Sequence, residues 1–395
     1  MNKTLKSIIS IVLCMATLVF IGCSKTTPET PSISEKPTES AQAAPENNSE
    51  SEVTEEAESR TVTDALGKEV TVPGKVENIA IISTMPLASV YCMAGGDPAK
   101  LVALTPSSKN AAVNSFLNLV APELENISTA FAEGESINIE ELLNLNPDVI
   151  FYNIDDPVGV EAVGKLEMMG VPCVGFDTRI SNTIETFNNW ATLVGQVLGT
   201  ETEVEQIVKY GYEVEQMVID RVSAIPEEDR KSAIILSNYN EAMIQVAGST
   251  FGRYWLSTVG AINPAEGIEQ KIAPVSLEQI YEWDPDVILL NSFSAFTAEQ
   301  VMNNAAIEGH DWSGLTAVKN GEFYKMPLGM YYWFPPCSDS PLALIWIAKH
   351  VYPEQFADID MDAEIKDFYS RFYGIELTDD DMLKLYNPPA ESAMG

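Results

Sequence analysis

Two segments of the chain share one pattern of apolar and polar positions. Residues 138–153 read NIEELLNLNPDVIFYN, and residues 276–291 read SLEQIYEWDPDVILLN. In each copy Asn138 or Ser276 can cap a helix of about two turns, a residue before proline ends the helix, and Asp-Val-Ile begins an apolar strand. Strands that are apolar on both faces are typical of parallel sheets covered by helices. The repeat therefore predicts two similar α/β lobes.

Other short apolar runs predict the remaining strands. We expect the first lobe to use residues 78–83, 101–104 and 172–176, and the second lobe to use residues 232–236 and 322–326. Between the lobes, residues 200–225 have apolar positions at helical intervals, and Thr200 and Glu203 have the spacing of a capping box. A single long helix between two lobes is stiffer than strand crossovers, so we expect only small closure when a ligand binds.

The first 23 residues have the layout of an export signal. Lys3 and Lys6 precede an apolar run over residues 8–21, which Gly22 and Cys23 follow. The run is too short for a stable membrane span, and a small residue directly before a cysteine resembles a lipobox. This pattern predicts that Cys23 is lipidated and anchors the protein to a membrane; an ordinary cleaved signal or an uncleaved anchor are the alternatives. Residues 24–60 are rich in Ser, Thr, Pro, Ala and Glu, which predicts a disordered acidic linker.

Charge and cysteine content narrow the possible partners. The formal net charge is −35 over 395 residues, which argues against nucleic acid and anionic lipid as partners because both need a positive surface. The acidity does not indicate a cationic ligand, since acidity spread over a whole surface mostly serves solubility. Beyond the signal, Cys92, Cys173 and Cys337 are far apart in the sequence, so we expect buried thiols with at most one disulfide.

Taken together, the motifs resemble those of class III periplasmic binding proteins, which serve ABC importers of iron siderophores, haem and cobalamin. The resemblance rests on the repeat, the long helix and four further segments: TVTDALGKEVTVP at 61–73, NIAIIS at 78–83, GLTAVKNGEFYKMP at 314–327 and LIWIAKHVYPEQF at 344–356. The closing stretch DFYSRFYGIELTDDD at 367–381 resembles a branch of that family that binds iron complexes or oxyanions such as molybdate.

The resemblance implies an α/β fold of two Rossmann-like lobes with mostly parallel central sheets, joined by a single long helix. The predicted parts are the signal 1–23, the linker 24–60, the N-terminal lobe 61–199, the interlobe helix 200–226, the C-terminal lobe 227–360 and a C-terminal extension 361–395. It also implies a monomeric binding protein, held outside the cell membrane by its lipid anchor, that delivers a small molecule to the permease dimer of an ABC importer. In that family a glutamate near the start of the repeated helix in each lobe docks on the importer, and these positions match Glu140 and Glu278. A carboxylate in the first turn is also simply a good helix start.

The ligand site is expected between the lobes, where the loops after the strands converge. Those loops begin at residues 83–86, 105–109 and 153–157 in the first lobe, and at residues 238–240, 292–296 and 330–336 in the second. Four successive aromatic residues at 331–334 would suit a flat or bulky chelate, or else pack between loop and lobe. The predicted ligand-binding residues are Ser83, Thr84, Met85, Tyr239, Arg253, Tyr331, Tyr332 and Trp333.

The aromatic run favours an iron chelate as the ligand, and the alternative is an oxyanion such as molybdate or tungstate. An oxyanion would need hydroxyl and amide donors, which Thr84, Ser107, Ser108 and Asn238 could supply. Arg253 and Lys109 could neutralise an anionic complex or be solvated.

A bare metal site, a resident cofactor and an enzyme activity are poorly supported. His310 and His350 have no second ligand at metal-binding spacing on one helix. The sequence has no nucleophile elbow, phosphate-binding glycine loop or dinucleotide fingerprint. A surface adhesion module would fit the anchor and linker but would leave the paired glutamates unexplained.

Overall fold

The computed structural model describes residues 58–134, 136–249 and 251–393. The predicted signal, with Cys23, and residues 24–57 of the predicted linker lie outside the described residues. Within the described part of the chain, no helix combines the length and the apolar character needed to cross a membrane.

The first lobe is built on a parallel sheet of four strands in the order β4-β3-β7-β8. The strands are β3 (Ile79–Ile81), β4 (Leu101–Leu104), β7 (Val149–Asn153) and β8 (Cys173–Phe176). All four confirm the predicted runs. Two small hairpins, β1 (Arg60–Thr63) with β2 (Glu69–Val72) and β5 (Ala132–Glu133) with β6 (Ser136–Ile137), accompany this sheet.

The second lobe has a separate five-stranded sheet in the order β11-β10-β9-β12-β13. Its strands are β9 (Ala233–Asn240), β10 (Met243–Ala247), β11 (Ile272–Val275), β12 (Val287–Leu290) and β13 (Phe323–Lys325). β9, β12 and β13 are parallel, as predicted, whereas β10 and β11 form an antiparallel edge. The predicted loop at 238–240 is therefore wrong: β9 continues to Asn240 because it pairs with β10.

The repeated segments have the predicted helix-to-strand structure in both lobes. Asn138 caps α4 (Ile139–Leu143) and Ser276 caps α9 (Leu277–Trp283), each through its side-chain oxygen. Asn146 and Asp284, directly before the prolines, have φ angles of 48° and 36° and turn the chain towards β7 and β12.

The aspartates that follow the two prolines make equivalent hydrogen bonds in the two lobes. Asp148 Oδ2 accepts hydrogen bonds from the backbone of Glu77 and Asn78, ahead of β3. Asp286 Oδ2 accepts from the backbone and the hydroxyl of Ser232, ahead of β9. Each copy of the repeat therefore also fixes the start of the neighbouring strand.

Helices cover both faces of each sheet. Those of the first lobe are α1 (Leu87–Met93), α2 (Pro106–Val113), α3 (Leu117–Val120), α4, α5 (Pro157–Met168) and α6 (Thr183–Leu198). Those of the second lobe are α8 (Phe251–Thr258), α9, α10 (Ala298–Met302), α11 (Thr316–Asn320) and α12 (Ser340–Val351). Short 3-10 turns occupy Pro98–Lys100, Pro122–Asn126, Glu227–Asp229 and Ala390–Ser392.

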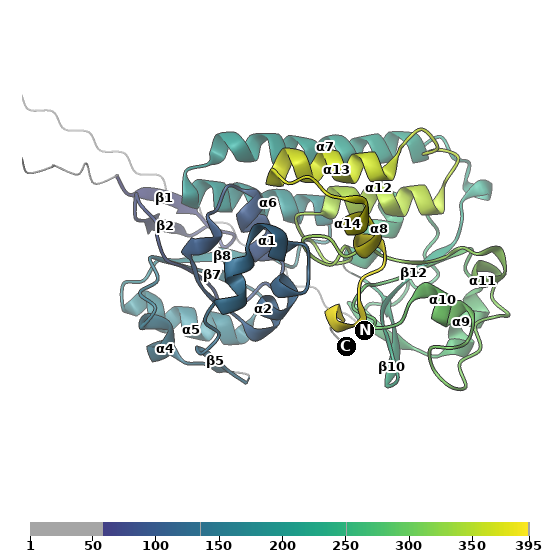
Figure 1. Ribbon diagram of the computed structural model, residues 1–395, viewed down its shortest axis with the longest axis horizontal. Coiled ribbons are helices and arrows are strands. Elements are labelled where there is room, and N and C mark those ends of the chain that lie inside the picture. The colour runs from purple at the N-terminus through teal and green to yellow at the C-terminus, as the bar shows by residue number, and fades with distance from the viewer. Residues whose placement is uncertain (1–57, 135, 250, 394–395) are drawn as a thin grey trace, which may run out of the picture. The chain divides into compact units, whose positions relative to one another are not determined.

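The long helix α7 (Glu201–Val222) confirms the predicted connection between the lobes. It packs against α6 of the first lobe and α12 of the second, and it runs along the top of Figure 1. The predicted capping box is wrong: the Thr200 hydroxyl donates to the carbonyl of Ala94 at 2.6 Å instead of capping α7. Gly211 lets α6 come close, because a Cβ there would lie 2.7 Å from Asn188 Oδ1.

The two lobes share one apolar core along this helical layer. Ile79, Ile81 and Val149 of the first sheet and Ile235 and Leu289 of the second belong to the same buried cluster. The opposite face of each sheet has its own core. The lobes are therefore joined by continuous packing as well as by the chain connection.

A C-terminal extension follows α12. It contains α13 (Met361–Tyr373) and α14 (Asp379–Tyr386), and Ile365, Phe368 and Leu385 belong to the shared core. Cys92, Cys173 and Cys337 are free thiols, with Cys173 and Cys337 buried, as expected.

Candidate functional site

A small apolar cluster joins the two lobes on the side of the sheets where the parallel strands end. Met85 and Ala111 come from the first lobe, and Phe293, Leu328, Tyr331, Tyr332 and Cys337 come from the second. The rings of Phe293 and Tyr332 lie edge to face with their centroids 4.6 Å apart. The rings of Tyr331 and Tyr332 are also edge to face, with centroids 5.1 Å apart. We call these seven residues the interlobe cluster. The structure thus brings together three predicted ligand-binding residues: Met85, Tyr331 and Tyr332.

Thr84, the residue before Met85 of this cluster, has a strained backbone. Its φ is 71°, in the left-handed region that a β-branched residue rarely adopts. Its Oγ1 is buried and has no hydrogen-bond partner among the described residues. Strain of this kind collects at binding sites, where the surrounding structure holds it in place. Thr84 therefore carries a buried hydroxyl that makes no hydrogen bond within the described chain, and its role in ligand binding stays a prediction.

Tyr331 supplies a second buried hydroxyl from the other lobe. Its OH group also has no hydrogen-bond partner among the described residues. Burial raises the pKa of Tyr331 well above its ordinary value, so the group stays protonated and can donate. Met85, the neighbour of Thr84, packs in the same cluster as Tyr331. One unpaired hydroxyl, that of Tyr331, therefore belongs to the interlobe cluster, and the other lies on Thr84, the residue before Met85 of the cluster.

A buried carboxyl group holds the backbone of the aromatic loop. Asp339 Oδ2 accepts from the Tyr331 backbone N–H at 3.1 Å, and Oδ1 accepts from the Tyr369 hydroxyl at 3.1 Å. Gly329 makes room for this contact, because a Cβ there would lie 2.2 Å from the Tyr369 hydroxyl oxygen. Burial raises the pKa of Asp339 to about 7. Tyr331 is thus positioned by α12 and α13 as well as by its own loop.

The rest of the aromatic run faces the protein interior. Trp333 and Phe334 belong to the shared core, with 0% and 2% exposure. Phe251 packs edge to face on Phe334 at 4.9 Å, and Trp255 Nε1 donates to the Phe334 carbonyl at 2.8 Å. The alternative expected from sequence, packing between loop and lobe, describes these two residues. A ligand contact for Trp333 stays a prediction.

Three other predicted ligand-binding residues have partners inside their own lobes. The Ser83 hydroxyl accepts from the Asn153 backbone N–H at 2.7 Å. The Tyr239 hydroxyl contacts His310 Nδ1 and Trp312 Nε1, each at 3.1 Å. Arg253 Nη2 donates to the Glu266 carbonyl at 2.7 Å. Their roles in ligand binding stay predictions.

The residues considered for an anionic ligand are likewise held locally. Lys109 Nζ donates to the Ile127 carbonyl at 3.3 Å. Ser107 and Ser108 lie within hydrogen-bonding distance of the Thr105 hydroxyl, at 3.2 and 2.8 Å. Asn238 Oδ1 accepts from Asn240 Nδ2 at 3.3 Å. Of the residues named from sequence for an anionic ligand, two have a buried side-chain donor atom without a partner in the described chain: Thr84 Oγ1 and Arg253 Nε.

The histidines are both occupied by neighbouring groups. His310 contacts Tyr239, whereas His350 Nδ1 lies 2.7 Å from the Trp346 carbonyl. Burial lowers the pKa of His350. Among residues 58–134, 136–249 and 251–393 there is no group of three or more His, Cys, Asp or Glu side chains that could hold a metal ion.

The two candidate docking glutamates are exposed in the first turns of matching helices. Glu140 lies in α4 of the first lobe and Glu278 in α9 of the second. Backbone and Ser276 hydrogen bonds lower the pKa of Glu278. Both are therefore accessible to a partner protein.

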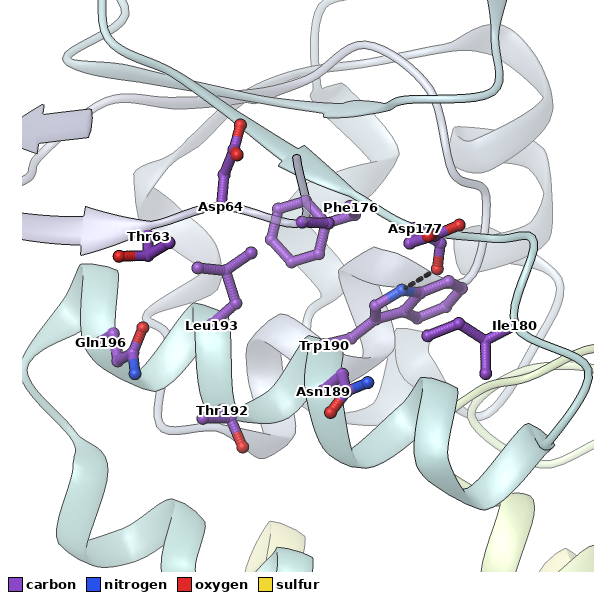
Figure 2. A pocket seen from close by; sticks show the side chains of 11 residues that line it. Thr63, Asp64, Phe176, Asp177, Ile180, Asn189, Trp190, Thr192, Leu193 and Gln196 are labelled. Atoms are coloured by element: carbon purple, nitrogen blue, oxygen red, sulfur yellow. Dashed lines mark hydrogen bonds between the residues drawn. The ribbon is translucent and has the colours of Figure 1, made fainter. Parts of the chain in front are cut away.

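A hollow of about 280 Å³ in the first lobe lies away from the interlobe cluster. Residues of β1, the end of β8 and α6 line it, and Trp190 Nε1 donates to the Asp177 carbonyl at 2.9 Å within it (Figure 2). None of its eleven described lining residues has a positive φ or a buried side-chain N or O atom without a partner. This hollow therefore has neither a strained residue nor an unpaired buried polar atom in its described lining, and it is a weaker candidate for the ligand site than the interlobe cluster.

Two contributors to the cluster could not be identified from sequence. Phe293 lies in a predicted loop, but no pattern in the neighbouring residues indicates that its ring packs against Tyr332. Ser392, near the end of the chain, accepts a hydrogen bond from the Tyr332 hydroxyl through its carbonyl. A backbone carbonyl has no sequence signature, so only the structure could reveal this contact.

Comparison with known proteins gives one family and several relatives. The family model described as periplasmic binding protein matches residues 79–328. The molybdate-binding protein MolA of Haemophilus influenzae is 24% identical over 333 residues, which cover 80% of this chain and 91% of MolA. The iron(3+)-hydroxamate-binding protein FhuD of Bacillus subtilis is 25% identical over 226 residues, which cover 54% of this chain and 66% of FhuD.

Solved structures agree with the two-lobed fold. A periplasmic solute binding protein from Veillonella parvula aligns with a TM-score of 0.76 at 29% identity, covering 84% of this chain and 97% of that one. MolA bound to molybdate aligns with a TM-score of 0.67 at 24% identity, covering 81% of this chain and 99% of MolA.

Proposed function

Because this chain belongs to the periplasmic binding protein family, we propose that it binds a small metal oxyanion, such as molybdate or tungstate, between its two lobes. Proteins of this family deliver small ligands to the permeases of ABC importers outside the cytoplasm. The chain is accordingly a solute-binding protein and not an enzyme. The observation that carries the oxyanion proposal is the pair of unpaired buried hydroxyls, Thr84 Oγ1 and Tyr331 OH.

Hydroxyl donors suit an oxyanion well. The oxygens of such an ion accept hydrogen bonds, and a buried donor without a partner recovers its lost hydration by binding one. Trp333 and Phe334 pack in the shared core, which leaves two of the four rings of the aromatic run in the interlobe cluster for a flat chelate. The match to MolA over 91% of its length supports the same ligand class.

An iron chelate is the second candidate. The edge-to-face rings of Phe293, Tyr331 and Tyr332 favour it, because aromatic faces bind bulky apolar chelates. FhuD, the hydroxamate-binding relative, supports it over a shorter part of the chain. The two candidates require different rearrangements. A chelate requires the aromatic rings to separate, whereas a small oxyanion requires only space beside the two hydroxyls.

The remaining parts of the proposal concern attachment and docking. Cys23 would carry the lipid that holds the protein at the outer face of the cell membrane. Glu140 and Glu278 would pair with basic residues of the importer, one from each lobe. Charge pairs of this kind govern orientation and association rate more than affinity.

Thermal unfolding of the purified protein with a panel of ligands tests the proposed function. Molybdate or tungstate at 100 times its Kd should stabilise the protein by about 2.7 kcal/mol, and sulfate serves as the matched oxyanion without a metal. A shift with ferric hydroxamate or haem and none with the metal oxyanions would favour the second candidate. No shift with any of these ligands would contradict both.

A further inference from the structure

The last described residues of the chain pass between the two lobes. We call residues 387–393 the C-terminal tail. Asn387 and Pro389 line a hollow of about 410 Å³ with Val113, Phe116 and other residues of the first lobe. Asn387 and Pro388 line a second hollow, of about 540 Å³, with residues of β13, α10 and α12 in the second lobe. Figure 1 shows this yellow end of the chain between α2 and β12.

The tail ends on the interlobe cluster. Its 3-10 turn, Ala390–Ser392, is closed by the Ser392 backbone N–H donating to the Pro389 carbonyl at 3.0 Å. The Ser392 carbonyl then accepts from the Tyr332 hydroxyl, and Ser392 is only 1% exposed. Tyr332 belongs to the cluster in which the ligand is proposed to bind. The tail therefore uses a hydrogen-bond donor of the candidate site.

The tail is mostly exposed and is attached by few interactions. Pro388 and Ser392 are buried, whereas the residues at 387, 389, 390 and 391 are exposed. Pro388 and Pro389 have no backbone N–H to donate, and a hollow lies beside each of them. Its polar contact with the cluster is the one between Ser392 and Tyr332. Segments with few contacts open at low free-energy cost, and the two prolines restrict the conformations of the released tail.

We propose that the C-terminal tail is a built-in competitor of the ligand, which leaves the interlobe cluster when the ligand enters. This inference rests on the proposed function, because it places the ligand in the same cluster. A tethered segment competes at a high effective concentration, so even a weak contact lowers the observed affinity. The tail would keep the empty site closed and set the ligand concentration at which the protein loads.

Two truncated chains test the competition. A chain ending at Tyr386 lacks the tail, whereas a chain ending at Ala393 keeps the Ser392 carbonyl and is the matched control. Calorimetric titration with molybdate, and with ferric hydroxamate, should give at least a fivefold lower Kd for the chain ending at Tyr386. Equal Kd values, or weaker binding by the shorter chain, would overturn the proposal.

A tail peptide separates this proposal from that of the function. The peptide NPPAESAMG, residues 387–395, should bind the chain ending at Tyr386, and adding ligand should displace it. Peptide binding without any binding of the tested ligands would contradict the proposed function and leave tail docking supported. Ligand binding that the peptide does not affect at millimolar concentration would overturn the tail proposal alone.

Discussion

At the scale of single residues, Thr84 shows how the site differs from the rest of the fold. Four described non-glycine residues have a positive φ, and three of them are Asn or Asp, which tolerate this region. Asn146 and Asp284 have an evident purpose, since each ends a helix before a proline. Thr84 is β-branched and its buried hydroxyl lacks a partner in the described chain. A threonine at this position lowers the stability of the fold, and a hydrogen bond from its hydroxyl to a ligand would offset that cost.

Replacing Thr84 by glycine should separate the effect of backbone strain on stability from the contribution of the Thr84 hydroxyl to ligand affinity. Thr84→Gly relieves about 1–2 kcal/mol of left-handed strain and adds about 0.5–1 kcal/mol of backbone entropy cost. The free energy of unfolding should therefore stay the same or rise by up to about 1.5 kcal/mol, while ligand affinity falls at least tenfold. Urea unfolding and ligand titration measure the two effects.

Asn146→Gly provides the matched control for this substitution. It changes a residue of similar φ in the same lobe, in a turn outside the interlobe cluster, so ligand affinity should be unchanged. A large loss of stability in Thr84→Gly, or unchanged affinity, would show that the hydroxyl does not serve the ligand.

At the scale of elements, Asp339 connects the aromatic loop to two helices. It precedes α12, accepts from the Tyr331 backbone and accepts from Tyr369 of α13. Burial of the carboxyl group away from water makes its ionisation costly, which raises the pKa of Asp339 to about 7. Burial therefore outweighs these hydrogen bonds, which by themselves favour the ionised carboxylate.

This raised pKa predicts a pH dependence of stability with a definite sign. The folded protein holds the Asp339 proton up to about pH 7, whereas the unfolded chain loses it near the ordinary value of 3.8. The stability from this group is thus present below the ordinary pKa and is lost as the pH rises towards 7. Between pH 5 and pH 8, the unfolding free energy of the natural protein minus that of Asp339→Asn should fall by about 3 kcal/mol.

Urea unfolding at several pH values measures this difference. Glu141→Gln, on the exposed face of α4, controls for the removal of one carboxyl group. A difference that is constant or increases with pH would contradict a protonated Asp339.

Local patterns in the sequence predicted the elements well, because each depends on neighbouring residues. Asn138 and Ser276 cap their helices as expected, and every predicted strand is present. The errors concern distant contacts: Thr200 bonds to Ala94 instead of its own helix, and β9 extends because β10 pairs with it. The same limit applies to the site, since Trp333 and Tyr332 are adjacent in sequence but belong to different apolar clusters.

At the scale of the whole described fold, the two lobes present similar surfaces to a partner. Glu140 and Glu278 are exposed at equivalent positions of the repeated units. The sequence repeat could predict this equivalence because both glutamates lie in the first turn of their helices. An importer with two similar subunits could contact one glutamate with each.

Charge reversal of both glutamates should block delivery without affecting capture. The double variant Glu140→Lys and Glu278→Lys should reduce ligand uptake by cells at least tenfold and leave the Kd of the purified protein unchanged, because neither side chain lies in the interlobe cluster. Glu141→Lys with Glu282→Lys makes the same charge change on the same two helices and should preserve uptake. Normal transport by the first variant would exclude the docking role.

The packing of α7 against both lobes has a consequence for how an importer could tell a loaded protein from an empty one. With α6, α7 and α12 in one shared core, bending at the joint would break apolar contacts that run through both halves. We therefore expect the shape of the molecule to change little when a ligand binds. An importer would then have to recognise the loaded protein from small local differences in the surface near the interlobe cluster. It would detect these by direct contact, because the overall conformation would not report the ligand.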